Sequence, residues 1–356
     1  MQGRLQKCRY LLQKISAQAV IVTKGKNRQY LSGFTGSSGV LLITNTEQVL
    51  FTDFRYVEQA KAQASDFTVI RHGTDLFSDI AVWLQDHPLE VIAYEADQLT
   101  VDTYEKLQKT LQGKTLLATK LDELRQIKDD EELAYIDKAV QIADQAFNQL
   151  LTLLRPGMTE LEAAAQLEYA MRKLGSEKTS FDTIVASGER GALPHGQASL
   201  KMLSPGELIT FDFGAVYKGY CSDMTRTVAL GKASEKQRAV YDTVLKAQLA
   251  ALQEIQAGRV CSEVDKVARD VIAAAGYGDY FGHGLGHSVG LAIHEEPRLS
   301  PTCQDVLAEQ MTMTVEPGIY IPGFGGVRIE DLVVVSASGC RILTQSTKEL
   351  IELKCN

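Results

Sequence analysis

Short apolar runs alternate with amphipathic segments along the first third of the chain. Each apolar run is bounded by polar or turn-forming residues, which predicts strands, and the longer segments between them carry helical periodicity. The alternation predicts a small α/β domain over residues 1–122, ended by the charged stretch from Asp122 to Glu132. The predicted strands are AVIVT, GVLLIT, QVLFTD, FTVIRH, EVIAYEA and TLLAT, and the predicted helices are RYVEQAKAQA, LFSDIAVWLQDH and VDTYEKLQKTLQ.

The remaining chain, residues 123–356, carries one order of elements twice. Each half opens with two amphipathic helices and continues with strands. The second helix of each pair occupies the same interval between two glycines, 157–175 in the first half and 258–276 in the second. This pattern predicts a duplicated unit. Capping-box pairs start one helix in each half: Thr159 with Glu162, and Ser234 with Gln237.

The strands that follow each helix pair contain two acidic residues that we expect to face each other. Asp212 and Asp223 lie symmetrically about the predicted turn at Tyr217 to Gly219. Glu316 and Glu330 lie symmetrically about Gly323 in the second half. Because apolar and polar positions alternate in both segments, each half is predicted to present a carboxylate pair from one hairpin.

Such carboxylate pairs need a neutralising cation. Opposed like charges destabilise a sheet, and a buried carboxylate without a partner costs several kcal/mol. One possibility is a structural ion-pair network with Arg226 and Arg328. The other is a metal centre, because four carboxylates and one neutral histidine carry a charge that two divalent ions would cancel.

A source for that histidine is the stretch from Phe281 to Pro297, which contains His283, His287 and His294. Its spacing would suit one helical face, but its four glycines argue against a helix and favour a loop or strand end. Without the carboxylates, the stretch could equally be a surface loop.

A ligand set of mainly oxygen with a single imidazole favours Mn²⁺, with Co²⁺, Fe²⁺ or Zn²⁺ as alternatives. Two such ions about 3.5 to 4 Å apart would bridge a water and lower its pKa from about 15.7 toward about 7. The bridged hydroxide would be a nucleophile at neutral pH, and an amide is its natural target.

Composition excludes several other classes of function. The net charge of -8 and the pI near 5.4 give no basic stripe for nucleic acid. No apolar run approaches the roughly 18 residues of a membrane span, and the first residues lack the apolar core of a secretion signal. The six cysteines form no CxxC pair. We therefore expect a cytoplasmic protein with reduced thiols.

The motifs of the second part resemble those of the pita-bread metallopeptidases, in the branch that holds aminopeptidase P and prolidase. The resemblance covers essentially the whole chain, and it implies a creatinase-like amino-terminal α/β domain before an α+β pita-bread catalytic domain with an internal pseudo-two-fold repeat. The matching segments are LPHGQAS, FDFGAVYKGYCSDMTRT, HGLGHSVGLAIHE, TVEPGIY and GVRIED.

The resemblance also implies a role for each candidate residue. Asp223 and Glu330 would bridge both metal ions, and Glu316 would also accept the proton of the attacking water. His195 and His294 would hold the scissile carbonyl and the oxyanion, or pass a proton to the proline nitrogen, while His283 and Arg328 would line the pocket. Alternatively, His294 is a buried histidine bonded to Glu295 or Glu296, and Arg328 pairs with Glu330 or Asp331. The five implied metal ligands are Asp212, Asp223, His287, Glu316 and Glu330.

The activity implied by this resemblance is hydrolysis of the amide between an amino-terminal residue and proline, in a homodimer. The segment TDFRYVEQA, residues 52–60, favours an Xaa-Pro aminopeptidase, with an Xaa-Pro dipeptidase (prolidase) as the alternative. From another class, the chain could be a non-catalytic peptide- or protein-binding member of the fold. Such members lose metal ligands, whereas all five are present here.

Overall fold

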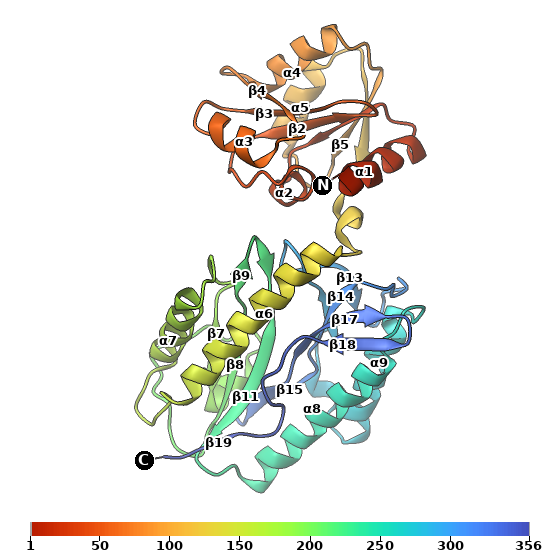
Figure 1. Ribbon diagram of the computed structural model, residues 1–356. Coiled ribbons are helices and arrows are strands. Elements are labelled where there is room, and N and C mark those ends of the chain that lie inside the picture. Colours follow the sequence, from red (N-terminus) through yellow and green to blue (C-terminus); the bar gives the residue numbers. More distant parts are fainter. Residues whose placement is uncertain (1, 356) are drawn as a thin grey trace. The chain divides into compact units, whose positions relative to one another are not determined.

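The computed structural model describes residues 2–355, which form two compact units (Figure 1). The boundary between the two units in the chain falls between Arg125 and Gln126, three residues beyond the boundary expected from the sequence. No helix among the described residues is both long and apolar enough to cross a membrane.

The first unit is built on one six-stranded sheet with the strand order β4-β3-β2-β1-β5-β6. The pairings β1–β2 and β2–β3 are antiparallel, and the other three are parallel. The six predicted strands are confirmed as β1 (Ala19–Val22), β2 (Val40–Thr44), β3 (Gln48–Thr52), β4 (Thr68–Arg71), β5 (Val91–Glu95) and β6 (Thr115–Thr119).

The three helices predicted for this unit are also confirmed, and two further helices were not anticipated. The helix α2 (Gly25–Ser32) buries Asn27, Arg28 and Ser32, so its buried face is partly polar and gives a weak hydrophobic period. The other helices are α1 (Gln2–Lys14), α3 (Val57–Gln63), α4 (Leu76–Gln85) and α5 (Val101–Thr110), followed by the short turn η1 (Asp122–Arg125).

The second unit contains the two predicted helix pairs. Both predicted capping boxes are present, at the starts of α7 and α8, and a third opens α6 at Asp129 and Glu132. In Figure 1, α6 and α8 cross the same side of the strands, and α7 and α9 lie on opposite flanks. The pairs are α6 (Asp130–Leu151) with α7 (Glu160–Lys173), and α8 (Glu235–Glu254) with α9 (Cys261–Ala274).

Strands from both halves of the second unit form several small sheets. A four-stranded sheet has the order β19-β11-β8-β7, and a three-stranded sheet has the order β14-β17-β18. Three hairpins or ladders of two strands complete the unit, β9–β10, β12–β13 and β15–β16. In the first half the strands are β7 (Ile184–Ser187), β8 (Leu208–Phe213), β9 (Val216–Tyr217), β10 (Tyr220–Cys221) and β11 (Met224–Leu230), and the turn η2 (Gly188–Ala192) follows β7. In the second half they are β12 (Gly286–Ser288), β13 (Glu295–Leu299), β14 (Thr312–Val315), β15 (Gly318–Ile321), β16 (Gly325–Arg328), β17 (Asp331–Ser336), β18 (Gly339–Ile342) and β19 (Glu352–Leu353), and the turn η3 (Gly278–Tyr280) precedes β12.

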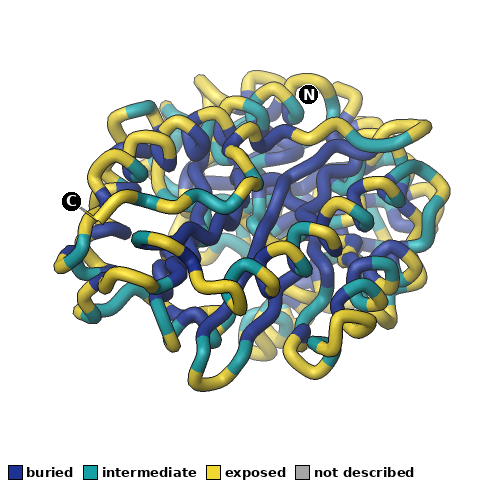
Figure 2. Tube along the Cα trace, turned by 90° about the horizontal axis from the view of Figure 1, so that it is seen from below, coloured by how far each residue is buried: buried dark blue, intermediate teal, exposed yellow. Residues whose placement is uncertain are grey.

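Two apolar clusters hold the helix pairs against these strands. One packs α6 and α7 on β8 and β11, and the other packs α8 and α9 on β14 to β17. Figure 2 shows the buried positions gathered along the central strands and the exposed ones along outer loops and helices. Burial of this apolar area is the main stabilising term, and it leaves the strand ends free to carry polar side chains.

Candidate active site

The nine side chains singled out from the sequence all line one cavity of about 540 Å³ in the second unit. The histidine-rich stretch forms loops around β12 and β13, as expected from its glycines, and the acidic residues come from strand ends. The nine are His195, Asp212, Asp223, His283, His287, His294, Glu316, Arg328 and Glu330.

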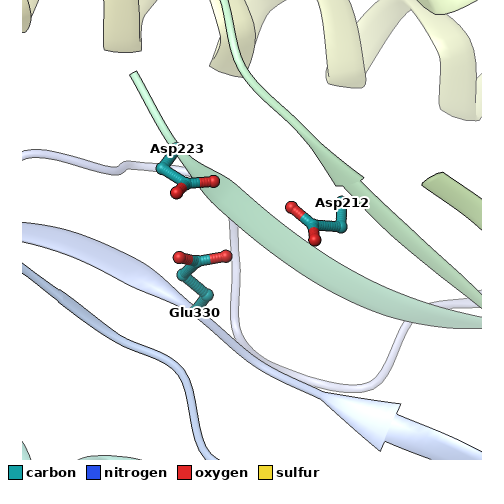
Figure 3. Close-up of side chains that lie close together, drawn as sticks. All are labelled: Asp212, Asp223 and Glu330. Atoms are coloured by element: carbon teal, nitrogen blue, oxygen red, sulfur yellow. The ribbon is translucent and has the colours of Figure 1, made fainter. Parts of the chain in front are cut away.

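Three carboxylates form the centre of this site. One oxygen from each of Asp212, Asp223 and Glu330 lies within 4.8 Å of the others. Figure 3 shows the three side chains converging on one space, with Asp212 and Asp223 from the first half and Glu330 from the second. The duplicated halves therefore supply the cluster together.

The register within the first hairpin differs from the expectation by two residues. Asp212 pairs with Thr225, and Asp223 lies just before β11, so the two aspartates are diagonal neighbours and are not directly opposed. The hairpin turns at Lys218 and Gly219, both with positive φ, which moves its centre by one position. Because the shift is even, both carboxylates keep the same face of the sheet.

In the second hairpin, the pairing of β15 with β16 matches Gly318 to Arg328. Continuing this register by two residues brings Glu316 opposite Glu330, as expected from the symmetry about Gly323. The two hairpins thus differ in geometry although their sequence patterns look alike.

His287 is the histidine closest to the carboxylates. Its Nδ1 lies 3.0 Å from the carbonyl oxygen of Ser288, and because a carbonyl only accepts, Nδ1 carries the proton. The Nε2 lone pair then faces Asp223 Oδ2 at 3.6 Å and Glu316 Oε1 at 3.4 Å. Burial lowers the pKa of His287 to about 3, so an imidazolium is disfavoured there.

This donor set fits a divalent cation. Burial, followed by repulsion from the neighbouring carboxylates, raises the pKa of Asp223 and of Glu330 well above the ordinary range. Within residues 2–355, Asp212 Oδ1 and Glu330 Oε1 are buried and accept no hydrogen bond. Unsatisfied buried oxygens beside an imidazole lone pair are what metal ligation would complete.

Arg328 offsets only part of the negative charge. Its Nη2 donates to Asp212 Oδ2 at 2.6 Å, and so its carboxylate partner is neither Glu330 nor Asp331, the two considered from the sequence. One guanidinium can balance the charge of only one of the four carboxylates, with Glu316 included. A structural ion-pair network therefore does not account for the cluster. Arg226, the other candidate, pairs with Asp331 at 2.8 Å, and Asp331 is not one of the four clustered carboxylates.

A second network joins Arg328 to His283 through Tyr320. Arg328 Nη1 donates to the Tyr320 hydroxyl at 2.9 Å, and that hydroxyl lies 2.8 Å from His283 Nε2. His283 Nδ1 contacts the carbonyl of Gly284, so Nε2 accepts the tyrosine proton. Burial lowers the pKa of His283 to about 4, which keeps the ring neutral. Both ring nitrogens of His283 are therefore engaged within the protein.

His195 and His294 lie at the more open side of the cavity. Both residues are exposed, and His294 packs edge-on against His287 with ring centroids 4.5 Å apart. The alternative of a buried His294 does not fit, because His294 is exposed. Glu295 Oε1 accepts from the backbone N–H of Ala292 at 3.0 Å.

The sequence did not single out four polar residues that shape the site. Thr225 Oγ1 donates to Glu330 Oε2 at 2.7 Å and accepts from Arg328 Nε at 3.0 Å, and Thr314 Oγ1 donates to Glu316 Oε1 at 3.0 Å. Threonines in strands have no distinctive spacing, but Tyr320 lies in the segment TVEPGIY. Arg298 also lines the cavity and has a carboxylate, Glu296, 3.4 Å from its Nε.

The chain is similar to known peptidases over nearly its whole length. Residues 4–127 match the creatinase/prolidase N-terminal domain, and residues 134–337 match metallopeptidase family M24. The chain is 44% identical over 352 residues to the uncharacterized peptidase YqhT of Bacillus subtilis, covering 98% of this chain and 100% of that one. It is similar to the structure of an Xaa-Pro dipeptidase from Bacillus anthracis, with a TM-score of 0.96, 43% identity and 99% of each chain covered. An X-Pro aminopeptidase structure from Thermotoga maritima gives a TM-score of 0.90 and 39% identity, covering 95% of this chain and 99% of that one.

Proposed function

This chain belongs to metallopeptidase family M24 and is a peptidase specific for Xaa-Pro bonds, and from that premise we propose that it acts as an Xaa-Pro dipeptidase. The observation that carries the proposal is Arg298, an exposed arginine on the cavity wall whose pair with the exposed Glu296 a substrate carboxylate can replace. The sequence alone favoured an aminopeptidase, and the presence of this cation is why we now rank the dipeptidase first.

Two guanidinium groups line the cavity, and they differ in their engagement. Arg328 is buried and donates to Asp212, to Tyr320 and to the carbonyl of Pro194. The side chain of Arg298 is 55% exposed, and its contact in the structure is the exposed Glu296 at 3.4 Å. An exposed ion pair of this kind is weak and easily exchanged for another carboxylate.

A dipeptide and a longer peptide differ in charge directly after the scissile bond. In an Xaa-Pro dipeptide the proline ends in a carboxylate, whereas in a longer peptide it continues as a neutral amide. A guanidinium binds a carboxylate through charge-assisted hydrogen bonds, about twice as strong as neutral ones. A cation on the cavity wall therefore favours the dipeptide.

The reaction itself needs a strong nucleophile, because the tertiary Xaa-Pro amide has no N–H and a restricted backbone. We propose that Asp212, Asp223, His287, Glu316 and Glu330 hold two divalent ions. When bound, such ions lower the pKa of a water and polarise a carbonyl. We propose that Glu316, which lines the cavity, accepts the proton of the attacking water. We also propose that His195 and His294 contact the scissile carbonyl and the proline nitrogen.

Manganese is the metal we propose first, because oxygen ligands dominate the set and only one imidazole joins them. Cobalt, iron and zinc are compatible with the same ligand types. Metal analysis of the purified protein, followed by chelation and reconstitution with each ion, distinguishes them.

Xaa-Pro aminopeptidase activity is the second candidate. It is supported by the similarity to the Thermotoga maritima X-Pro aminopeptidase, which is 39% identical. Residues 52–60, which favoured this activity in the sequence, span the end of β3 and the start of α3 in the first unit. The homodimer and the cytoplasmic location stay predictions from the sequence, and sedimentation and cell fractionation would check them.

The test compares three substrates that share Xaa and proline: the dipeptide, the dipeptide amide and an Xaa-Pro-Yaa tripeptide. We expect wild-type kcat/KM to be highest for the dipeptide. Arg298→Ala should lower kcat/KM for the dipeptide by about 10- to 100-fold, which corresponds to the loss of one charged hydrogen-bonded pair. It should leave kcat/KM for the dipeptide amide unchanged. Arg341→Ala, at a similarly exposed arginine on β18, is the matched control. Preference for the tripeptide would instead support the aminopeptidase, and no metal-dependent turnover would support the non-catalytic binding alternative.

A further inference from the structure

A buried glutamate outside the carboxylate cluster holds both ends of the loop that carries His195. Glu160 is the first residue of α7 and is fully buried. Its Oε1 accepts from the backbone N–H and the hydroxyl of Ser187, each at 2.8 Å. Its Oε2 accepts from the backbone N–H of Ser199 at 3.2 Å, from the Ser199 hydroxyl at 2.6 Å and from Arg190 Nε at 3.1 Å. One carboxylate thus joins residues 12 positions apart.

His195 lies between these two anchored serines. Its imidazole has no hydrogen-bond partner among the residues that the structure describes, although the residue lines the cavity. No hydrogen bond from its side chain to a described residue therefore orients the ring, so its position depends on the path of the loop backbone. The loop turns tightly there, with the N–H of Gly196 donating to the carbonyl of Leu193 at 3.0 Å.

The middle of the loop rests on β16. A Cβ added to Gly326 would lie 2.1 Å from the carbonyl oxygen of Gly191, so the two backbones touch closely. Arg328, on the same strand, donates from Nη1 to the carbonyl of Pro194 at 3.2 Å. The loop therefore has a middle contact on the cavity wall and an anchor at its two ends, and Glu160 supplies the anchor.

The chemistry of the anchor requires a carboxylate. All five contacts of Glu160 are donors, and a carboxylate only accepts. In an amide, one of the two oxygens becomes an NH₂ group, which would face a backbone N–H of either Ser187 or Ser199. Two N–H donors that face each other in a buried place cannot bond, so both would be left without an acceptor. We expect this to displace one end of the loop.

We propose that Glu160 is a positioning residue for the reaction: it fixes the loop from Ser187 to Ser199 and thereby sets where the His195 imidazole meets the peptide. This inference rests on the proposed function, in which His195 contacts the substrate. Glu160 does not line the cavity, and its side chain bonds Ser187, Arg190 and Ser199, so it would act on the peptide through the loop.

The test uses Glu160→Gln, with Glu162→Gln as the matched control. Glu162 lies two residues along the same helix, is exposed, and accepts from the Thr159 backbone in the capping box. We expect Glu160→Gln to lower kcat on an Xaa-Pro dipeptide by about 10- to 100-fold with a smaller change in KM, because a displacement of about 1 Å costs that much. Amide hydrogen exchange in residues 188–199 should become faster in Glu160→Gln alone, and metal content should not change.

A double-mutant cycle with His195→Ala separates positioning from general stability. If Glu160 acts through His195, Glu160→Gln should add no further loss of kcat in the His195→Ala background. The proposal would be overturned if the losses of kcat in the two single variants multiplied in the double variant, if kcat were unchanged despite faster exchange, or if exchange were unchanged.

If Glu160→Gln fails to fold, Ser199→Ala can be used instead. It removes one donor to Glu160 and should give a smaller loss of kcat; a wild-type kcat in that variant would also overturn the proposal. A wild-type protein that does not hydrolyse Xaa-Pro bonds would refute the proposed function itself, whereas the positioning role fails only in the variants.

Discussion

Removing one carboxylate from the central cluster should stabilise the metal-free protein while destroying its activity. Asp223, Asp212 and Glu330 present oxygens within 4.8 Å of one another, and Asp223 and Glu330 are almost fully buried. Without a cation, the repulsion among them opposes folding. Asp223→Asn keeps the shape of the side chain and removes its charge.

The size of this effect is bounded by two estimates. At 4.8 Å and an effective dielectric constant of about 20, each like-charge pair costs about 3.5 kcal/mol. Asp223 has two such neighbours, but this repulsion is removed when Asp223 takes up a proton. Protonating a carboxyl group with an ordinary pKa of 3.8 at a working pH of about 7.5 costs about 5 kcal/mol, and this is therefore the upper limit of the repulsion that Asp223 can contribute. We therefore expect Asp223→Asn to stabilise the metal-free protein by about 1 to 5 kcal/mol.

The effect has a defined pH dependence. The pKa of Asp223 is raised in the folded protein, mainly by burial and then by the neighbouring carboxylates, so the folded state holds a proton that the unfolded chain has lost. The stability of metal-free wild type consequently falls as pH rises above the ordinary carboxyl range. Because the variant lacks this group, its advantage over wild type should be larger at about pH 8 than at about pH 5.5.

Thermal unfolding with and without chelator measures this directly. For a unit of this size, 1 kcal/mol corresponds to about 2–4 °C in Tm, so the chelated variant should melt at least a few degrees above chelated wild type. Mn²⁺ at 100 times its Kd adds about 2.7 kcal/mol to the form that binds it, so it should raise the Tm of wild type more than that of the variant and shrink the difference between them.

Asp182→Asn is the control, since Asp182 is an exposed aspartate on the same cavity where solvent screens its charge. An equal or lower Tm for chelated Asp223→Asn at pH 8 would refute the electrostatic argument. An equal rise in Asp182→Asn would refute it too, because the effect would then not depend on burial.

Two further substitutions test the support of the site. Arg226→Met removes the guanidinium of a buried ion pair and should cost about 3–5 kcal/mol in urea unfolding, whereas Arg238→Met, in an exposed pair, should cost less than about 1 kcal/mol; equal losses would contradict the role of burial. Gly326→Ala places a methyl group 2.1 Å from the carbonyl oxygen of Gly191 and should lower both stability and kcat. Gly282→Ala has open space around the new methyl group and should have little effect on either quantity; a tolerated Gly326→Ala would show that the two backbones can separate.

The strands and helices of this protein follow closely from its hydrophobic pattern, but the register of one hairpin does not. Alternation placed Asp212 and Asp223 on one face correctly because that face depends only on the two-residue period. Their offset depends on the turn, where Lys218 adopts positive φ beside Gly219. A lysine in that conformation is uncommon, so the pattern gave no sign that the centre of the hairpin lies one position further on.

The sequence also did not predict which side chains of one half would pair with side chains of the other. Arg328 lines the cavity, as the resemblance implied, and the ion pair considered as the alternative was with its acidic neighbours Glu330 or Asp331. Its guanidinium instead reaches Asp212, 116 positions away, because the strands of the two halves meet at the cluster. Tyr320 and Thr225 then complete its hydrogen bonds. These contacts depend on how the halves come together, which a local pattern of polar and apolar positions does not contain.

The contacts that join the halves are the same ones that orient the proposed metal ligands. Thr225 on β11 donates to Glu330 from the second half, and Arg328 from the second half donates to Asp212 on β8. Each half alone would hold two carboxylates with no partner for either hydrogen bond. Since a buried polar group without its partner costs about 1–3 kcal/mol, the assembly that builds the site also stabilises the fold. The stability lost to repulsion within the cluster is therefore offset in part by the hydrogen bonds around it, and the protein tolerates a destabilising centre because its immediate surroundings are satisfied.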